Sequence, residues 1–224
     1  MTCTVDVHFE CLYGGQNMVK LELVEQVLKL IEKASTDLPQ DIQDRLQEIR
    51  DEEEQGSPAR FGMDVILENI KAARHEKVPM CQDTGTLVFE IYYPVGVSTL
   101  EIKKQIEKAV VQATEKSFLR PNSVNSITGK NSGNNLGTEQ PYLHFMEWEK
   151  EHLEIHLLLK GGGCENVGIQ YSIPHTALKA GRDLEGVRRV VIDAVFQAQG
   201  KGCGPGFIGV GIGGDRGTGY LLAK

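Results

Sequence analysis

Residues 86–93 of the chain read TLVFEIYY, a run that separates a helical N-terminal third from a strand-rich remainder. The run is rich in β-branched and aromatic residues, and Pro94 and Gly96 follow it closely, so we predict a strand that ends at Tyr93. The change of pattern begins at Pro79. A chain with helices first and strands later is typical of an α+β fold rather than of alternating βα units.

Helical spacing of apolar residues predicts three helices before this strand. The first covers about residues 19–34, the second starts near Pro39 and Asp41, and the third begins at Ser57-Pro58, a good N-cap followed by proline at the first helical position. The acidic run 51–54 should close the second helix as a solvated face. The positions expected to face the core are Val24, Val27, Leu28, Ile31, Ile42, Leu46, Ile49, Phe61, Val65, Ile66 and Ile70.

After the strand, Ser98 and Glu101 form a capping box that predicts a further helix to about Lys116, with Ile102, Ile106, Ala109 and Ala113 facing the core. Apolar and polar residues then alternate in 142–148 and in 153–160 around a short charged turn, which predicts an antiparallel hairpin. A helix over 184–199 and a strand over 207–212 complete the expected elements. The predicted fold is therefore α+β, with N-terminal helices followed by a mixed, largely antiparallel sheet with packed helices.

The composition is that of an ordinary globular protein. The 224 residues include 24 Lys and Arg against 31 Asp and Glu, for a formal net charge of −7, and 40% are hydrophobic. We expect a loose N-terminal extension over residues 1–17 and one domain over residues 18–224, truncated at its C-terminus. The acidic balance argues against nucleic-acid binding, since phosphate-binding surfaces are basic. No apolar run is long enough to cross a bilayer, so we expect no membrane association.

The chain has five cysteines, an odd number, widely spaced and without any C-x-x-C pair. These features argue against a disulfide framework and against a zinc ribbon, and we expect reduced thiols in the cytoplasm. Three roles stay open for them: buried thiols, a nucleophile, or a metal site assembled from distant loops.

Cys81, Gln82 and Asp83 precede the predicted strand directly. A thiol, an amide and a carboxylate on consecutive residues are costly to bury unpaired and useful in a cleft. The alternative is a plain turn in which Asp83 caps its own backbone while Cys81 packs as a small hydrophobe.

Two glycine-rich segments are further candidates. Gly161, Gly162 and Gly163 follow a predicted strand and permit positive φ angles and close approach to an anion or carboxylate, with Cys164 as a lining residue directly after them. Cys203 lies in the turn GCGPG, where the neighbouring glycines would let a bulky inorganic group approach, although a plain loop thiol fits this pattern too.

Arg120 begins a long polar stretch, residues 120–140, of the kind that is usually functional or disordered. Its guanidinium is suited to bind a substrate carboxylate through two parallel hydrogen bonds. The alternative is that Arg120 is an ordinary surface arginine. Gly209, Gly211 and Gly214 satisfy G-x-G-x-x-G, but only ten residues follow and no βαβ unit surrounds them, so we reject a dinucleotide site.

Five segments, taken in order, resemble a known family: PMCQDTGT, FLRPNSV, ITGKNSG, LKGGGCEN and GCGPGFIGVGIGG. The chain from about Val19 onward is similar to the α subunit, or N-terminal half, of the class I iron–sulfur hydro-lyases, which are fumarate hydratase and L-tartrate dehydratase. The resemblance implies a [4Fe-4S] cluster held by three cysteines. Cys81 and Cys203 match two ligands, and no residue matches the third. Cys164 stands where the tartrate enzymes have cysteine and is disfavoured as a ligand.

The resemblance also implies roles for other residues. Gln82 and Asp83 match substrate contacts, with Asp83 as a catalytic acid or base; Arg120 matches a carboxylate-binding arginine; and the turn 161–163 matches backbone that lines the site. The implied reaction is reversible hydration of fumarate to malate, a small dicarboxylate, on the open iron as Lewis acid. The implied partner is a β subunit, in a dimer of α/β units.

Two alternatives remain at this level. The first is an L-tartrate dehydratase α subunit, favoured by Cys164, whereas Glu165-Asn166 and the GIGG sequence lean toward fumarate hydratase. The second is a truncated, non-catalytic α fragment that acts as an assembly or interaction module.

Overall fold

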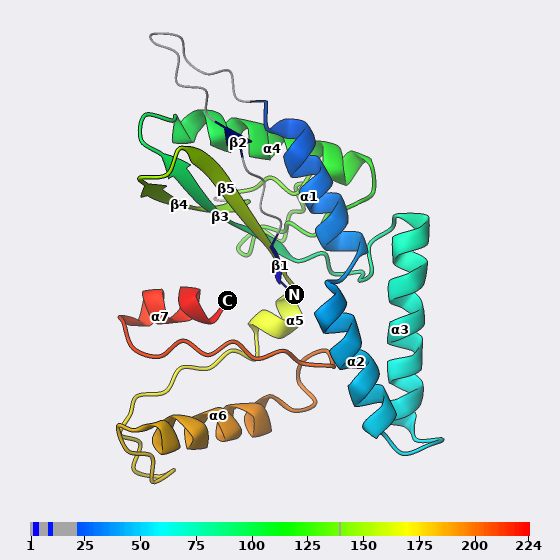
Figure 1. Ribbon diagram of the computed structural model, residues 1–224, viewed down its shortest axis with the longest axis vertical. Helices are drawn as coiled ribbons and strands as arrows, with labels where there is room; N and C mark the ends of the chain where they lie inside the picture. Colours follow the sequence, from blue (N-terminus) through cyan, green and yellow to red (C-terminus); the bar gives the residue numbers. More distant parts are fainter. Residues whose placement is uncertain (1, 5–8, 11–21, 139) are drawn as a thin grey trace. The chain divides into compact units, whose positions relative to one another are not determined.

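The computed structural model describes residues 2–4, 9–10, 22–138 and 140–224, and it divides into two compact units, Met1–Lys160 and Gly161–Lys224. Figure 1 shows the course of the chain through both. Each unit is described by itself, and the single domain expected over residues 18–224 stays a prediction. Two short pieces of the expected N-terminal extension, β1 (Thr2–Thr4) and β2 (Phe9–Glu10), pair with the strand β5. The rest of that extension lies outside the described residues, so its boundary stays a prediction.

Unit 1 contains four helices and the sheet. The helices are α1 (Val24–Thr36), α2 (Gln40–Glu52), α3 (Pro58–Glu76) and α4 (Thr99–Glu115). The long strands are β3 (Thr86–Pro94), β4 (Tyr142–Trp148) and β5 (His152–Lys160). The α+β class is confirmed, and so are the caps: Ser57 accepts a hydrogen bond from the Arg60 amide, and Ser98 accepts one from the Glu101 amide.

The main core lies between the sheet and the helices α1 and α4, which cover one of its faces (Figure 1). Alternate residues of β3 and β5 point into this core, among them Phe89, Ile91, Ile155 and Leu157, all of which are fully buried or nearly so. The predicted inward positions of α4 are confirmed and completely buried: Ile102, Ile106, Ala109 and Ala113.

The predicted hairpin is wrong. β4 pairs with β3 in parallel and β5 pairs with β3 antiparallel, so β3 lies between them in the order β1-β5-β3-β4. Residues 149–151 therefore carry the chain past the end of β3 rather than around a tight turn. The alternation correctly indicated a strand in both segments, but alternation is the same whichever strand is the neighbour. β3 takes the centre because its apolar residues are buried along most of its length.

A second, smaller core joins α2 and α3 through Leu38, Leu46, Met63 and Ile70. Here the predicted stripe was partly wrong, because Phe61 is 70% exposed and Val65 is 48% exposed. The sequence of α3 offers two overlapping apolar stripes with helical spacing. The one that includes Met63 and Ile70 faces α2, because α3 contacts its neighbours mainly along α2.

Unit 2 contains α5 (Gly162–Glu165), α6 (Leu184–Ala198) and α7 (Arg216–Ala223). The helix expected over 184–199 is confirmed, and Asp183 caps it by accepting a hydrogen bond from the Gly186 amide. The strand expected over 207–212 is wrong, since this stretch pairs with no other strand among the described residues. Gly209 and Gly211 instead lie against the backbone of α7, where a Cβ would come within 1.7 Å of the Ala223 oxygen and 2.2 Å of the Gly219 oxygen.

Candidate active site

The CQDTG segment forms a tight turn directly before β3. The Asp83 amide donates a hydrogen bond to the Cys81 sulfur over 3.4 Å, and the Gly85 amide donates to the Asp83 Oδ1 over 2.8 Å. Gly85 has a φ of +74°, and a Cβ there would lie 2.6 Å from the backbone of Lys160 at the end of β5. The turn therefore requires glycine at this position, both for the backbone angle and for the approach of β5.

This geometry resolves the two readings of the segment. Asp83 does cap its own turn, as the plain reading expected, but Cys81 is exposed and does not pack as a small hydrophobe. Gln82 is exposed as well, while Asp83 is partly buried. The turn thus exposes the Cys81 thiol and the Gln82 side chain, while its backbone fixes the Asp83 carboxylate.

The Arg120 loop is hydrogen-bonded to this turn. Thr84 Oγ1 accepts from the Arg120 amide over 3.1 Å and donates to the Arg120 carbonyl over 3.4 Å. The Asn122 side-chain amide donates to Asp83 Oδ1 over 3.0 Å and to the Gln82 carbonyl over 3.4 Å. Three predicted site residues, Gln82, Asp83 and Arg120, are therefore brought together in unit 1 by contacts that span about forty residues of sequence.

Asn135 organises the start of the polar loop, although it was not among the predicted site residues. Its side chain is 2% exposed; Oδ1 accepts from the amides of Asn122 and Ser123, and Nδ2 donates to the Arg120 carbonyl and to Thr114. Its φ of +60° is one that asparagine tolerates better than most residues. The only sequence signal was the abundance of asparagine in 120–140, which does not say which one is buried.

The rest of the polar loop is ordered by its own backbone. Val124 and Asn131 form an antiparallel bridge, and Asn125 Oδ1 accepts hydrogen bonds from the amides of Ile127 and Thr128 at the tip. Of the two readings left for a long polar stretch, functional or disordered, the structure removes disorder for the described residues of this loop.

The other predicted site residues lie in unit 2. The three glycines after β5 start the short helix α5, with Gly161 as its N-cap at a φ of −66°. The sequence permits positive φ angles at Gly161, Gly162 and Gly163, but all three keep φ angles that other residues can adopt. A Cβ on Gly163 would lie in ordinary contact with the Cys203 sulfur, at 3.7 Å, so α5 borders the GCGPG turn directly.

Three cysteines offer thiol donors for a metal group. Cys81, Cys164 and Cys203 are all free and exposed, and the Cys81 sulfur already accepts a backbone hydrogen bond of the kind that tunes iron–sulfur clusters. These features fit thiolate ligation by Cys81 and Cys203. Within the described ranges, however, no three His, Cys, Asp or Glu side chains gather closely enough to hold a metal ion.

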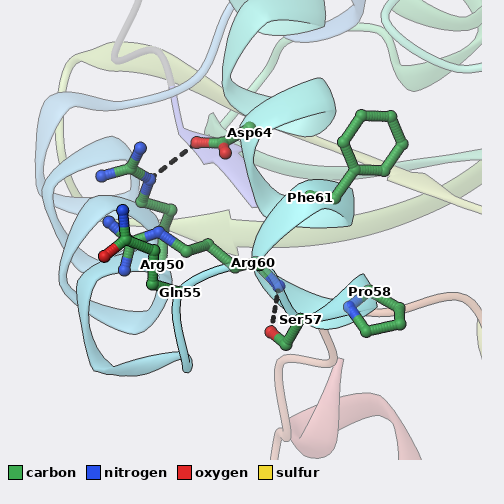
Figure 2. Close-up of a pocket in the computed structure, with 8 residues that line it drawn as sticks. Arg50, Gln55, Ser57, Pro58, Arg60, Phe61 and Asp64 are labelled. Carbon is green, nitrogen blue, oxygen red and sulfur yellow. Dashed lines mark hydrogen bonds and ion pairs between the residues drawn. The ribbon is translucent and has the colours of Figure 1, made fainter.

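A surface pocket lies elsewhere in unit 1, at the turn between α2 and α3 (Figure 2). Arg50 and Arg60 line it together with the exposed ring of Phe61. Arg50 is bound to Asp64 over 2.6 Å and to Asp51 over 2.8 Å, so its charge is already balanced within the α2–α3 hairpin. None of the predicted site residues lines this pocket, and we do not assign it to the site.

Comparison with known proteins identifies the family. Residues 24–224 match the family described as Fumarate hydratase (Fumerase), which is nearly the whole chain. The chain belongs to the fumarate hydratase family. This confirms the resemblance drawn from the five motifs, all of which lie within the matched residues.

Individual relatives carry two kinds of name. A Geobacillus stearothermophilus protein provisionally named fumarate hydratase class I is 50% identical over 206 residues, which are 91% of this chain and 40% of that protein. A Methanocaldococcus jannaschii protein provisionally named L(+)-tartrate dehydratase subunit alpha is 32% identical, over 91% of this chain and 71% of that protein. The L(+)-tartrate dehydratase subunit alpha of Escherichia coli (strain K12) is 28% identical, over 91% and 66% respectively.

The chain thus spans two fifths of the length of the Geobacillus relative and about two thirds of the tartrate dehydratase subunits. Among the described residues, no helix has both the length and the apolar character needed to cross a membrane.

Proposed function

We propose that this chain is the α component of an iron–sulfur hydro-lyase that reversibly hydrates fumarate to malate. The observation that carries the proposal is the coupling of Asp83 to the Arg120 loop through Asn122 and Thr84, which puts an acid/base group and a carboxylate-binding cation on one framework. Membership of the fumarate hydratase family and 50% identity to the Geobacillus relative support the same assignment.

Arg120 binds the substrate in this proposal. Its side chain is exposed, while its backbone is fixed by Thr84 and Asn135, so the guanidinium projects from a rigid base. A planar guanidinium can donate two parallel hydrogen bonds to one carboxylate. This pair of bonds orients a dicarboxylate in addition to balancing its charge.

Asp83 moves or positions the proton. The Gly85 amide and the Asn122 side chain both donate to its Oδ1, and these two bonds hold the plane of the carboxylate in one orientation. A carboxylate oriented before substrate binds is what general acid/base catalysis requires, since proton transfer depends on distances of about 3 Å. Gln82, exposed beside it, would contact the substrate.

Cys81 and Cys203 are the residues we assign to the [4Fe-4S] cluster, with the third ligand unassigned and Cys164 disfavoured. When bound, such a cluster with one open iron supplies Lewis-acid polarisation and a template for the substrate oxygens. The glycines at 161–163, beside Cys203, would line the same site. A thiolate-ligated cluster requires a reducing compartment, and we infer a cytoplasmic enzyme on this ground.

The remaining catalytic groups would come from a β-type partner, in a dimer of α/β units. The names of the tartrate dehydratase relatives describe those proteins as alpha subunits, and we extend that organisation to this chain as part of the proposal. Tartrate is the second candidate substrate, supported by these relatives and by Cys164, whose thiol is exposed immediately after the glycine turn.

The deciding experiment is anaerobic reconstitution of the full chain with iron and sulfide, alone and with the β-type partner, followed by assays on fumarate and on L-tartrate. We expect iron and sulfide to be incorporated and fumarate to be hydrated by the two-component enzyme. Turnover of tartrate alone would overturn the substrate assignment. Failure to incorporate iron with and without the partner would overturn the enzyme assignment and favour a non-catalytic assembly fragment.

A further inference from the structure

Glu165, the last residue of α5, carries a contact that the proposed chemistry does not use. Lys224 Nζ lies 3.1 Å from Glu165 Oε1, while Glu165 Oε2 is buried and meets no hydrogen-bond donor among the described residues. A buried carboxylate oxygen without a donor is unfavourable, so a protein retains one where the rest of the side chain is strongly held. The residues that hold it are Tyr220 in α7 and Lys224, which directly follows α7.

Tyr220 is the second group on this carboxylate. Burial raises the pKa of Tyr220, and the nearby charge of Glu165 together with a hydrogen bond to it raises that pKa further. Gly168 leaves room for it, since a Cβ there would lie 2.7 Å from the Tyr220 hydroxyl oxygen. Lys224 Nζ also lies 5.3 Å from the centre of the Tyr220 ring. Glu165, Tyr220 and Lys224 thus form one cluster.

This cluster ties α7 to the turn beside Cys203. The Glu165 amide donates to the Gly161 carbonyl over 3.0 Å, so the side chain of Glu165 is coupled to the whole glycine turn. Gly163 faces the Cys203 sulfur, and a Cβ on Gly202 would lie 3.7 Å from the Gly163 carbonyl oxygen. A displacement of Glu165 would therefore be transmitted to the surroundings of the Cys203 thiol.

We propose that Glu165 is a positioning residue: held by Lys224 and Tyr220, it fixes the glycine turn against the Cys203 loop and so sets the orientation of the Cys203 thiol. The inference rests on the proposed function in that Cys203 is a cluster ligand there. It is testable without the cluster, because the thiol can be followed directly in the full chain.

The first test is the rate at which Cys203 reacts with iodoacetamide in Glu165→Gln, measured by peptide mass spectrometry. Glutamine keeps the shape and removes the charge that holds Lys224. We expect the Cys203 rate to change by about fivefold, the effect of losing one modest contact, while the Cys81 rate in unit 1 of the same molecule stays unchanged. An unchanged Cys203 rate at unchanged melting temperature would refute the proposal.

Matched variants separate positioning from general destabilisation. Glu185→Gln removes an exposed carboxylate on α6 that pairs with Arg189, and it should leave the Cys203 rate at the wild-type value. Lys224→Met should change the Cys203 rate as much as Glu165→Gln does, whereas Lys224→Arg, which keeps the charge, should leave the rate at the wild-type value. The double variant Glu165→Gln/Lys224→Met should change the rate no more than either single variant does. Independent, additive effects would show that the two residues do not act through one contact.

The second test uses the iron-loaded protein. Glu165→Gln should lose iron to a chelator roughly tenfold faster or more, with an altered electron paramagnetic resonance spectrum, because supporting contacts of this kind orient metal ligands. If the wild-type chain takes up no iron, the proposed function is wrong. The alkylation rates still test the positioning role in that case, because they do not require iron. If wild type loads and Glu165→Gln matches it in iron retention, spectrum and alkylation rate, the positioning role fails alone.

Discussion

Thr84 and Arg120, 36 residues apart in the sequence, exchange two hydrogen bonds: the Arg120 amide donates to Thr84 Oγ1, and the same hydroxyl donates to the Arg120 carbonyl. The hydroxyl of one buried threonine, 5% exposed, thereby joins the CQDTG turn to the polar loop. A valine of the same shape could fill the space but could make neither bond.

Thr84→Val should therefore lower the free energy of unfolding by about 1 kcal/mol, the usual net worth of an intramolecular hydrogen bond, whereas Thr84→Ser should stay close to wild type. Urea unfolding followed by circular dichroism measures both. Equal stability of the valine and serine variants would show that the exchange contributes nothing.

Gly85→Ala should be strongly destabilising, because the new Cβ would meet the Lys160 backbone at 2.6 Å in addition to the strain at a φ of +74°. Gly56→Ala is the matched control: its φ is +83°, but nothing lies within 4 Å of the added carbon. We expect about 1–2 kcal/mol for Gly56→Ala from backbone strain alone and a clearly larger loss for Gly85→Ala. The comparison fails if the two losses are the same.

Cys81→Ser should abolish cluster binding and leave the fold intact, since the thiol is exposed and packs against no core residue. Cys164→Ser, also exposed, should retain wild-type iron and sulfide content. Metal and sulfide analysis after anaerobic reconstitution measures the difference, with melting temperature as the check on folding. Full iron content in Cys81→Ser would remove that residue from the ligand set.

Arg120→Lys keeps the positive charge and loses the two-pronged geometry. In the two-component enzyme we expect the KM for fumarate to rise roughly 10- to 100-fold, the effect of losing a hydrogen bond to a charged group, with a smaller change in kcat. Arg45→Lys, on α2, serves as the control because Arg45 is paired with Glu48 at the surface. A KM within error of wild type for Arg120→Lys would exclude the clamp.

Tyr171 gives a pH prediction. Burial, and next the hydrogen bond to Asp193, raises the pKa of Tyr171 to about 12 from its ordinary value of 10.0. Because the folded-state pKa lies above the unfolded value, this contribution to stability is complete below about pH 10 and is lost as the pH rises through about 12. The difference in tyrosinate absorbance between wild type and Tyr171→Phe should titrate near pH 12, and a midpoint near 10 would contradict the assignment.

Local patterns in the sequence determined the positions of several helices and of the central strand. The capping residues Ser57 and Ser98, the apolar spacing of α4 and the limits of β3 depend on contacts within a few residues, so the sequence was sufficient to place them. The five motifs likewise identified the family, because residue types in a fixed order can be recognised without knowledge of the fold.

Only the tertiary structure decided which segments are neighbours. Alternation in 142–148 and 153–160 indicated two strands but could not reveal that β3 lies between them, since strand order depends on pairing across the sheet. In the same way, nothing local distinguished Asn135 from the other asparagines of the polar loop, or showed that Glu165 would meet Lys224. Hydrogen bonds and ion pairs between distant residues form only once the chain has folded, and these contacts hold the site together.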